Sequence, residues 1–283
     1  MDIRRTIETA VSTPINDISP LSGGCIGQVY RVVLADERQL VAKVDLNAEP
    51  RLATEGYMLQ YLAAHSELPV PDVVYSSDHL LIMTFLPGES HFTPATQAHA
   101  AELLAALHTV TAPQFGLERD TLIGGLHQPN RWTDNWLDFF REQRLLYMAQ
   151  EGVRTGRLPA AVLTRLTRFC GCLDAWLDEP ERPSLIHGDV WTTNVLAADG
   201  RITGFVDPAI YYAHPEIELA FTTLFGTFGE PFFARYHELH PIPPGFFEER
   251  RDIYNLYPLL VHVRLFGGGY VSSVERTLRR FGF

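Results

Sequence analysis

Cysteine is scarce in this chain, which has only three cysteines among its 283 residues. Three cysteines form no even disulfide set, so a disulfide framework is not the source of stability. Cys170 and Cys172 also lack the second cysteine pair that would complete a zinc site. Because these two fall in an apolar helical pattern, we expect them to be buried thiols.

Long hydrophobic runs are missing as well. Residues 1–7 lack the apolar core of a signal peptide, and no later apolar run is long enough to span a bilayer. We therefore predict a cytoplasmic protein without a membrane partner.

Basic residues are outnumbered, with 23 Lys and Arg against 34 Asp and Glu, for a net charge of −11. A negative surface repels a phosphate backbone, which argues against nucleic acid as a partner. A neutral or cationic substrate fits this field better than an anionic one.

The chain does contain enough apolar residues, 46% of 283, to bury a large core and to form two lobes. Residues 16–85 are dominated by β-like runs separated by turns, whereas the pattern from Pro94 onward is helical. The predicted fold is α+β, with a β-rich lobe over residues 1–86 and a helical lobe over residues 87–283.

Residues 187–194 are the most informative stretch, with the sequence HGDVWTTN. A short apolar run then leads to Asp207. Phosphoryl transfer from ATP needs a carboxylate to deprotonate the acceptor hydroxyl and oxygen ligands to hold Mg²⁺. Asp189 is the candidate base, and Asn194 and Asp207 are the candidate magnesium ligands. A turn rich in Asp and Asn is the alternative, but it does not explain their order.

Glycine-rich residues 22–27 lie between two β-like runs and predict a phosphate-binding turn. Glycine lets the backbone close over phosphate, so that N–H groups point at anionic oxygen. The candidates are Gly23, Gly24, Cys25 and Gly27. Taken alone, such a turn is also typical of an ordinary hairpin.

Lys43 and Glu55 strengthen the nucleotide-binding interpretation. Lys43 lies in the strand-like run 39–44, from which it can reach the α- and β-phosphates, and Glu55 lies in a helical pattern over residues 52–62, where it can hold the lysine. Separately, either side chain also fits a solvated position. The order of glycine turn, lysine, glutamate, catalytic loop and aspartate predicts a bilobal protein-kinase-like fold.

Residues 80–86 are the predicted connection between the lobes. The backbone of Thr84, Phe85 and Leu86 is placed to bind the edge of adenine, and Met83 borders the adenine pocket. Met83 equally fits a plain core position.

Helical periodicity predicts helices at four further places: residues 97–108, 135–148, 160–177 and from about residue 216. Residues 115–132 are expected to form an ordered loop that edges the acceptor cleft.

The whole chain resembles the fructosamine kinase (ketosamine-3-kinase) family, a branch of the protein-kinase-like small-molecule kinases. The HxDxxxxN motif alone is shared with aminoglycoside and choline kinases, so other segments narrow the choice. The segments that carry the resemblance are residues 23–26, 128–132, 139–145, 187–191, 207–212 and 264–267.

The resemblance implies phosphorylation, with ATP and Mg²⁺, of the sugar 3-hydroxyl of a ketosamine on a small-molecule or protein-bound glycated amine. The product in this family is unstable, so the sugar is lost and the amine is restored. Matched residue by residue, Asp189 is the base, Asn194 and Asp207 bind magnesium, and Lys43 with Glu55 forms the phosphate clamp.

At the acceptor end of the site, this chain matches the family less closely. Trp191 resembles the family's sugar-facing aromatic residue, and His262 resembles a polar residue near the acceptor; packing roles fit both equally. The family commonly has Asn at Val261, and often Arg at Pro215 and Asp at Glu218. These departures bear on the substrate and not on catalysis.

Two local expectations concern backbone and redox state. Proline disfavours helical backbone for the residue before it, so Pro208 predicts an extended Asp207. An amide-rich turn favours thiolate, which makes Cys25 the candidate for a redox-sensitive thiol; alternatively, it points inward as a small apolar residue.

Two other functions remain open. One is a kinase for another small hydroxyl compound, such as an aminoglycoside or an amino alcohol. The other is a nucleotide-binding pseudokinase that regulates a partner, which is disfavoured because none of the five site residues is missing.

Overall fold

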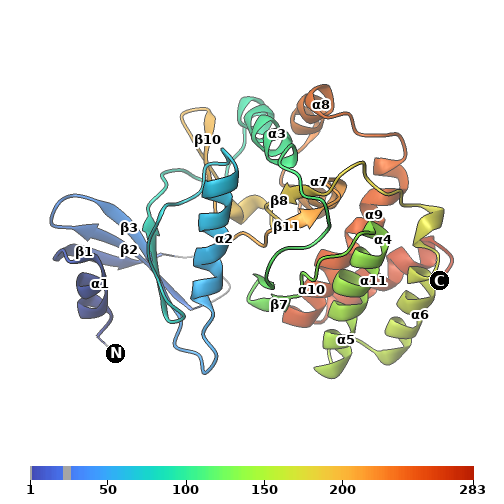
Figure 1. The fold of residues 1–283 in the computed structure, drawn as a ribbon, viewed down its shortest axis with the longest axis horizontal. Coiled ribbons are helices and arrows are strands. Elements are labelled where there is room, and N and C mark those ends of the chain that lie inside the picture. The colour runs from blue at the N-terminus through green and yellow to red at the C-terminus, as the bar shows by residue number, and fades with distance from the viewer. Residues whose placement is uncertain (1, 22–26) are drawn as a thin grey trace.

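The computed structural model describes residues 2–21 and 27–283 and has two lobes (Figure 1). The N-terminal lobe is built on one antiparallel sheet in which the strands lie in the order β1-β2-β3-β5-β4. Its elements are α1 (Ile3–Val11), β1 (Ile15–Pro20), β2 (Gln28–Leu34), β3 (Gln39–Val44), α2 (Leu52–His65), β4 (Val73–Ser76) and β5 (Leu80–Thr84).

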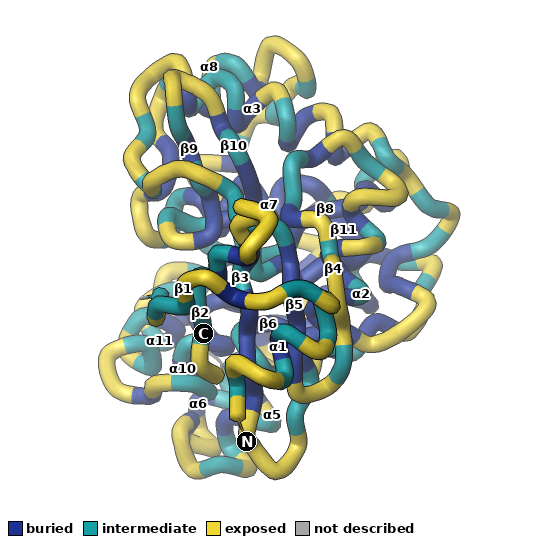
Figure 2. Tube along the Cα trace, turned by 90° about the vertical axis from the view of Figure 1, so that its left-hand side faces the viewer, coloured by how far each residue is buried: buried dark blue, intermediate teal, exposed yellow. Residues whose placement is uncertain are grey.

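The two faces of this sheet follow from side-chain alternation, since successive residues of a strand point to opposite faces. In β5, Leu80 and Ile82 are buried in the cluster that contains Ile7 of α1, whereas Leu81 and Met83 are buried with residues of α2. Lys43 of β3 pairs with Leu81, so it faces α2. Figure 2 shows β3 and β5 running largely buried through this lobe.

The C-terminal lobe is mainly helical, and its short strands form pairs (Figure 1). This arrangement confirms the predicted α+β, bilobal kinase-like fold. The helices are α3 (Pro94–His108), α4 (Trp136–Phe139), α5 (Tyr147–Arg154), α6 (Ala160–Cys170), α7 (Glu216–Leu224), α8 (Glu230–Leu239), α9 (Arg251–Tyr254), α10 (Leu256–Phe266) and α11 (Gly269–Arg280). The strand pairs are β6 (Thr121–Ile123) with β7 (Leu126–Gln128), β8 (Ser184–Ile186) with β11 (Tyr211–Ala213), and β9 (Val195–Ala198) with β10 (Arg201–Phe205).

The expected loop over residues 115–132 contains a hairpin that the sequence reasoning missed. β6 and β7 are joined at Gly124 and Gly125, which have φ of 52° and 79°. A two-residue turn with positive φ at both positions matches the twist of the flanking strands, and glycine adopts it without strain. The two glycines between short apolar runs were the available signal.

The predicted helix over residues 160–177 is too long, because α6 ends at Cys170. The chain turns at Gly171 and leaves Cys172 exposed, so the expectation of a buried Cys172 is wrong. Cys170 is buried as expected, and burial raises the pKa of its thiol to about 12. Cys25 lies outside the described residues.

Asp207 does not have the expected extended backbone, since its φ is 55°. Proline excludes mainly the right-handed helical region for the preceding residue, and aspartate tolerates the left-handed region. Pro208 therefore permits the left-handed conformation that Asp207 adopts.

Among the helices of the described residues, none is both long and apolar enough to cross a membrane.

A continuous helical segment runs from α4 through a π-helical stretch (Phe140–Leu146) into α5, in agreement with the helix predicted over residues 135–148. Arg144 in the π-helical stretch is fully buried. Its guanidinium donates to the Pro129 carbonyl oxygen and to Asn130 Oδ1, each at 2.6 Å, and lies 3.8 Å from the ring centroid of Tyr211. One cation thus joins this helix to the segment that follows β7 and to β11.

We predict that Arg144→Met lowers the free energy of unfolding by about 3 kcal/mol, because the buried acceptors of Pro129 and Asn130 lose charge-assisted hydrogen bonds. Urea unfolding followed by circular dichroism measures the change. Arg168→Met, on the exposed surface of α6, is the matched control for loss of a positive charge. Equal stability of the two variants would contradict the role of Arg144.

Candidate functional site

Asp189 and Asn194 lie on the loop that follows β8, as the motif predicts. Asn194 donates through Nδ2 to Asp189 Oδ2 (2.8 Å) and to the Asp189 carbonyl oxygen (3.0 Å). The amide therefore fixes the orientation of the carboxylate that is the candidate base.

Gly188 is required by the shape of this loop. Its φ is 84°, and a Cβ atom at this position would lie 2.2 Å from the Ala209 carbonyl oxygen. The Ala209 N–H in turn donates to the His187 carbonyl oxygen at 2.7 Å. These contacts hold the Asp189 loop against the chain that follows Asp207.

Lys43, Glu55 and Asp207 meet at the boundary between the lobes. The Lys43 ammonium donates to Glu55 Oε1 at 2.6 Å and to Asp207 Oδ1. Burial by itself would lower the pKa of Lys43, but attraction to the Asp207 and Glu55 carboxylates raises it above the ordinary value. The expected contact between Lys43 and Glu55 is thus present, and Asp207 is a second carboxylate partner of the lysine.

The environment of Asp189 favours a proton on its carboxylate. Burial, followed by repulsion from Asp207, raises the pKa of Asp189 to about 8, while the hydrogen bond from Asn194 acts in the opposite direction. A cation bound nearby would counter this shift, because it favours the ionised carboxylate.

A cavity of about 730 Å³ contains Lys43, Glu55, Asp189, Asn194 and Asp207 in its lining. Its size is that of a typical small-molecule site. The predicted hinge residues line it too, namely Met83, Thr84, Phe85 and Leu86.

The hinge backbone offers fewer donors than expected. The Thr84 N–H donates to the Asp72 carbonyl oxygen (2.9 Å) and the Phe85 N–H to the Gln39 carbonyl oxygen (3.1 Å). Among the described residues, the Leu86 N–H has no such partner, so it is the one hinge donor of these three that faces no backbone acceptor.

The glycine-rich turn is largely outside the described residues, which exclude Gly23, Gly24 and Cys25. Gly27 is described and has a φ of 71°. It lines the neighbouring cavity of about 690 Å³ and not the one that contains Asp189.

Trp191 and His262 lie on either side of an aromatic residue that the sequence reasoning missed. The Phe225 ring is 5.6 Å from that of Trp191 and 4.9 Å from that of His262, between centroids. His262 donates through Nδ1–H to the Pro258 carbonyl oxygen (2.7 Å), and burial lowers the pKa of its imidazole. His262 and Val261 share a small cavity with Asp189.

Pro215 is not near this end of the site, contrary to expectation. It precedes α7 and lines a separate cavity with His108 and Glu216. Of the three departures, Val261 and Glu218 line a small cavity with the candidate base, whereas Pro215 lines the separate one.

Glu218 of α7 anchors the catalytic loop, and its role was missed. Its carboxylate accepts from the Gly188 N–H (2.6 Å) and the His187 N–H (3.3 Å), and His108 Nε2 lies 2.9 Å away. Burial would raise the pKa of Glu218, but the hydrogen bond and charge of His108 hold it below the ordinary value. The sequence offered one signal for this role, because Glu218 keeps an acidic side chain at a position where the resembled family often has Asp.

The donor set fits Mg²⁺ held together with phosphate. Within residues 2–21 and 27–283, no group of three His, Cys, Asp or Glu side chains could hold a metal alone. Mg²⁺ usually needs only one or two protein carboxylates when a substrate supplies phosphates. Asn194 uses its amide hydrogens on Asp189, and its side-chain oxygen accepts one long hydrogen bond from Thr193 Oγ1 (3.3 Å), so a lone pair remains for a cation in the cavity that Asp207 also lines.

The model of the family described as "Fructosamine kinase" matches residues 1–281. A Synechocystis protein assigned as a ketoamine kinase is 34% identical over 94% of this chain and 90% of its own length. A protein-ribulosamine 3-kinase of Oryza sativa is 31% identical over 93% of this chain and 78% of its own length.

Solved structures agree with the predicted fold. The crystal structure of a Thermobifida fusca protein assigned as a fructosamine-3-kinase has a TM-score of 0.87 at 30% identity, covering 98% of this chain and 97% of that one. An aminoglycoside phosphotransferase complexed with ADP and hygromycin B has a TM-score of 0.73 at 18% identity and full coverage of both chains, a likeness of fold alone.

We predict that Glu218→Gln lowers the free energy of unfolding by about 2 kcal/mol, since a neutral amide cannot accept from Gly188, His187 and His108 together. Urea unfolding measures the loss. Glu230→Gln, at an exposed position, removes the same charge as a control. The anchoring role would be contradicted if both variants kept wild-type stability.

Proposed function

The chain belongs to the fructosamine kinase family, and we propose that it transfers the γ-phosphoryl group of ATP to the 3-hydroxyl of the sugar in a ketosamine. The single observation that supports this most is the Asp189 carboxylate, held by Asn194 in the same cavity as Lys43 and Asp207. A ketosamine is a sugar joined to an amine by non-enzymatic glycation.

Asp189 acts as the base in this proposal. Its carboxylate accepts the proton of the acceptor hydroxyl as that oxygen attacks the γ-phosphorus atom. Asn194 keeps the carboxylate in one orientation through the 2.8 Å hydrogen bond. Glu218 holds the loop in place because its carboxylate accepts hydrogen bonds from the backbone N–H groups of His187 and Gly188.

The nucleotide lies between the two lobes in this proposal, with adenine against Met83 and the hinge (Thr84, Phe85 and Leu86). Lys43, supported by Glu55, binds the α- and β-phosphates, and the glycine turn (Gly23, Gly24, Cys25 and Gly27) covers them. We take residue 86 as the end of the nucleotide-binding lobe (residues 1–86) and the start of the catalytic lobe (residues 87–283).

Asn194 and Asp207 hold Mg²⁺ in this proposal. When bound, Mg²⁺ neutralises the charge that develops on the phosphate oxygens. Asp207 accepts a hydrogen bond from Lys43, which supports a site in which the lysine and the proposed metal ligand face the same phosphates.

The sugar lies at the end of the cavity marked by Trp191 and His262. Phe225 fills the space between these two rings, which gives the acceptor an aromatic wall. Val261 supplies an apolar surface beside Asp189. The 3-phosphorylated product then loses its sugar and returns the free amine.

ATP turnover on a substrate panel tests the proposal. The panel contains fructosyl-, ribulosyl- and erythrulosyl-amines, and aminoglycosides and amino alcohols are tested separately as alternative substrates. Turnover confined to the latter two would replace the proposed substrate class, and nucleotide binding without any turnover would favour a regulatory pseudokinase.

We predict that Asp189→Asn lowers kcat on a ketosamine by about 10²-fold or more, the range expected for general base catalysis. The substitution keeps the shape of the side chain and an acceptor for Asn194, so folding and ATP binding should be retained. Steady-state kinetics and calorimetry with ATP measure the two effects.

Asp207→Ala serves as the contrasting variant, because it should weaken nucleotide binding only when Mg²⁺ is present. Retained turnover by Asp189→Asn would remove Asp189 from the role of base. If Asp207→Ala bound nucleotide as tightly as the wild-type protein both with and without Mg²⁺, Asp207 would be removed from the metal site.

A further inference from the structure

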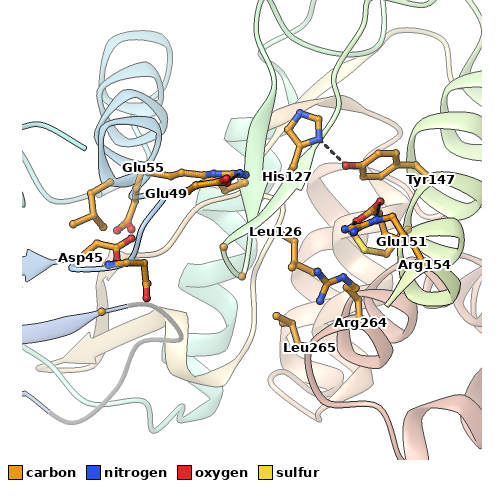
Figure 3. A pocket seen from close by; sticks show the side chains of 18 residues that line it. Asp45, Glu49, Glu55, Leu126, His127, Tyr147, Glu151, Arg154, Arg264 and Leu265 are labelled. Atoms are coloured by element: carbon orange, nitrogen blue, oxygen red, sulfur yellow. Dashed lines mark hydrogen bonds and ion pairs between the residues drawn. The ribbon is translucent and has the colours of Figure 1, made fainter. Parts of the chain in front are cut away.

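A second cavity, of about 690 Å³, lies between the lobes beside the nucleotide cavity (Figure 3). The two cavities share Glu55, Leu122, Gly124 and Gly125 in their linings. They therefore meet at the β6–β7 turn. The two turn glycines carry no side chain that could close the passage between the cavities.

The two walls of this cavity, here called the interlobe cavity, differ in charge. The N-terminal lobe contributes Asp45, Glu49 and Glu55, of which Glu49 pairs with Arg51 at 3.1 Å. The C-terminal lobe contributes Glu151 and Arg154 from α5 and Arg264 from α10, so this wall carries a net positive charge. A ligand with a cationic end and an anionic end is complementary to such walls.

Arg154 and Arg264 are not equivalent in the C-terminal wall. Arg154 is paired with Glu151 through two hydrogen bonds, of 2.8 and 2.6 Å. Among the residues that the structure describes, Arg264 has neither an ion pair nor a hydrogen-bond acceptor, and its Nε is buried without a partner. In Figure 3, its side chain extends from α10 toward Leu126.

The Nε of Arg264 is fully covered, whereas its terminal Nη groups, which have no acceptor among the described residues either, are the donors that a ligand in the cavity can reach. Donors left without an acceptor at a partly buried site favour a ligand that supplies one. Carboxylate is the acceptor that matches the planar guanidinium group best. Arg264 lines the cavity that meets the Asp189 cavity at the β6–β7 turn. A substrate that extends from Asp189 past this turn could therefore supply the acceptor that Arg264 lacks.

Resting on the proposed function, we propose that the interlobe cavity holds the amine part of the ketosamine and that Arg264 binds a carboxylate on it. The substrate class is then a glycated free amino acid, such as lysine glycated on its ε-nitrogen. The sugar lies at Asp189, the side chain passes the Gly124–Gly125 turn, and the α-ammonium group faces the acidic wall of Asp45 and Glu49.

Three ketosamines test this inference on the wild-type enzyme: the ε-adduct of lysine, the same adduct with the carboxylate converted to carboxamide, and the adduct of propylamine, which has neither a carboxylate nor an α-amino group. We expect kcat/KM for the carboxylate to exceed that for the carboxamide about ten- to hundredfold, the range of one charge-assisted hydrogen bond. Equal kcat/KM for these two would overturn the inference.

Arg264→Gln should raise KM for the carboxylate about tenfold or more with little change in kcat, because the contact is made equally in the ground and transition states. It should leave the carboxamide unaffected. Arg276→Gln, an exposed substitution on α11 with the same change in charge, should behave as wild type. Thermal unfolding verifies that both variants are folded.

These arms separate the two levels of the proposal. Turnover of propylamine adducts, together with no dependence on the carboxylate or on Arg264, would reject the role of Arg264 and keep the ketosamine kinase. Absence of turnover with all three adducts would reject the proposed function itself.

A second inference comes from the basic residues themselves. Lys43 is the only lysine in the chain, and the remaining basic residues among the 23 are arginines. Lys43 is only 7% exposed and is held by Glu55 and Asp207. Those carboxylates stabilise the ammonium form, which has no lone pair for reaction with a carbonyl group.

We infer that this enzyme resists the modification it is proposed to repair. Glycation begins when an unprotonated amine attacks the aldehyde carbon of a sugar; water leaves, and the resulting imine rearranges to a ketosamine without an external oxidant or reductant. Arginine stays protonated and is a poor nucleophile in this reaction. The α-amine is then the only readily glycated amine of the chain.

Incubation of untagged enzyme with ribose, without ATP, followed by intact-mass spectrometry and peptide mapping, tests this inference. The comparison is a triple variant with Arg5→Lys, Arg276→Lys and Arg279→Lys, all at exposed positions. We expect at most one pentose adduct on wild type and several on the variant. Adducts on Lys43, or equal numbers of adducts on both proteins, would overturn the inference.

Discussion

One buried ammonium group, that of Lys43, constrains how the two lobes meet. It must remain paired, because an unpaired charge at this depth is strongly destabilising. Its partners, Glu55 on α2 and Asp207 after β10, come from different lobes. The sheet, α2 and the loop of Asp207 are therefore restricted to arrangements in which these three side chains converge.

Further contacts between α2 and the C-terminal lobe support the same arrangement. The Tyr57 hydroxyl donates to Glu118 at 2.8 Å, and the hydroxyls of Tyr61 and Tyr212 lie 3.1 Å apart. The position of α2 thus depends on interlobe hydrogen bonds as well as on Lys43.

The sequence predicted the parts of the site that the motifs encode by order and spacing. Asp189 and Asn194 are five residues apart on one loop, so their contact follows from local geometry. Lys43 and Asp207 are distant in sequence, and the order of the motifs placed them in one site without predicting the contact between them. Glu218 and Phe225 were missed because their roles arise from how α7 packs against that loop, which no local pattern expresses.

The catalytic and acceptor parts of the site differ in how strictly the chain specifies them. The groups around Asp189 are fixed by charge and hydrogen bonds, whereas the acceptor end is formed by packed side chains such as Phe225 and Val261. Helix α10 carries both His262, which shares a small cavity with Asp189 at the proposed acceptor end, and Arg264, in the interlobe cavity. Changes on this one helix can therefore alter the choice of sugar and amine while the phosphoryl-transfer groups stay in place.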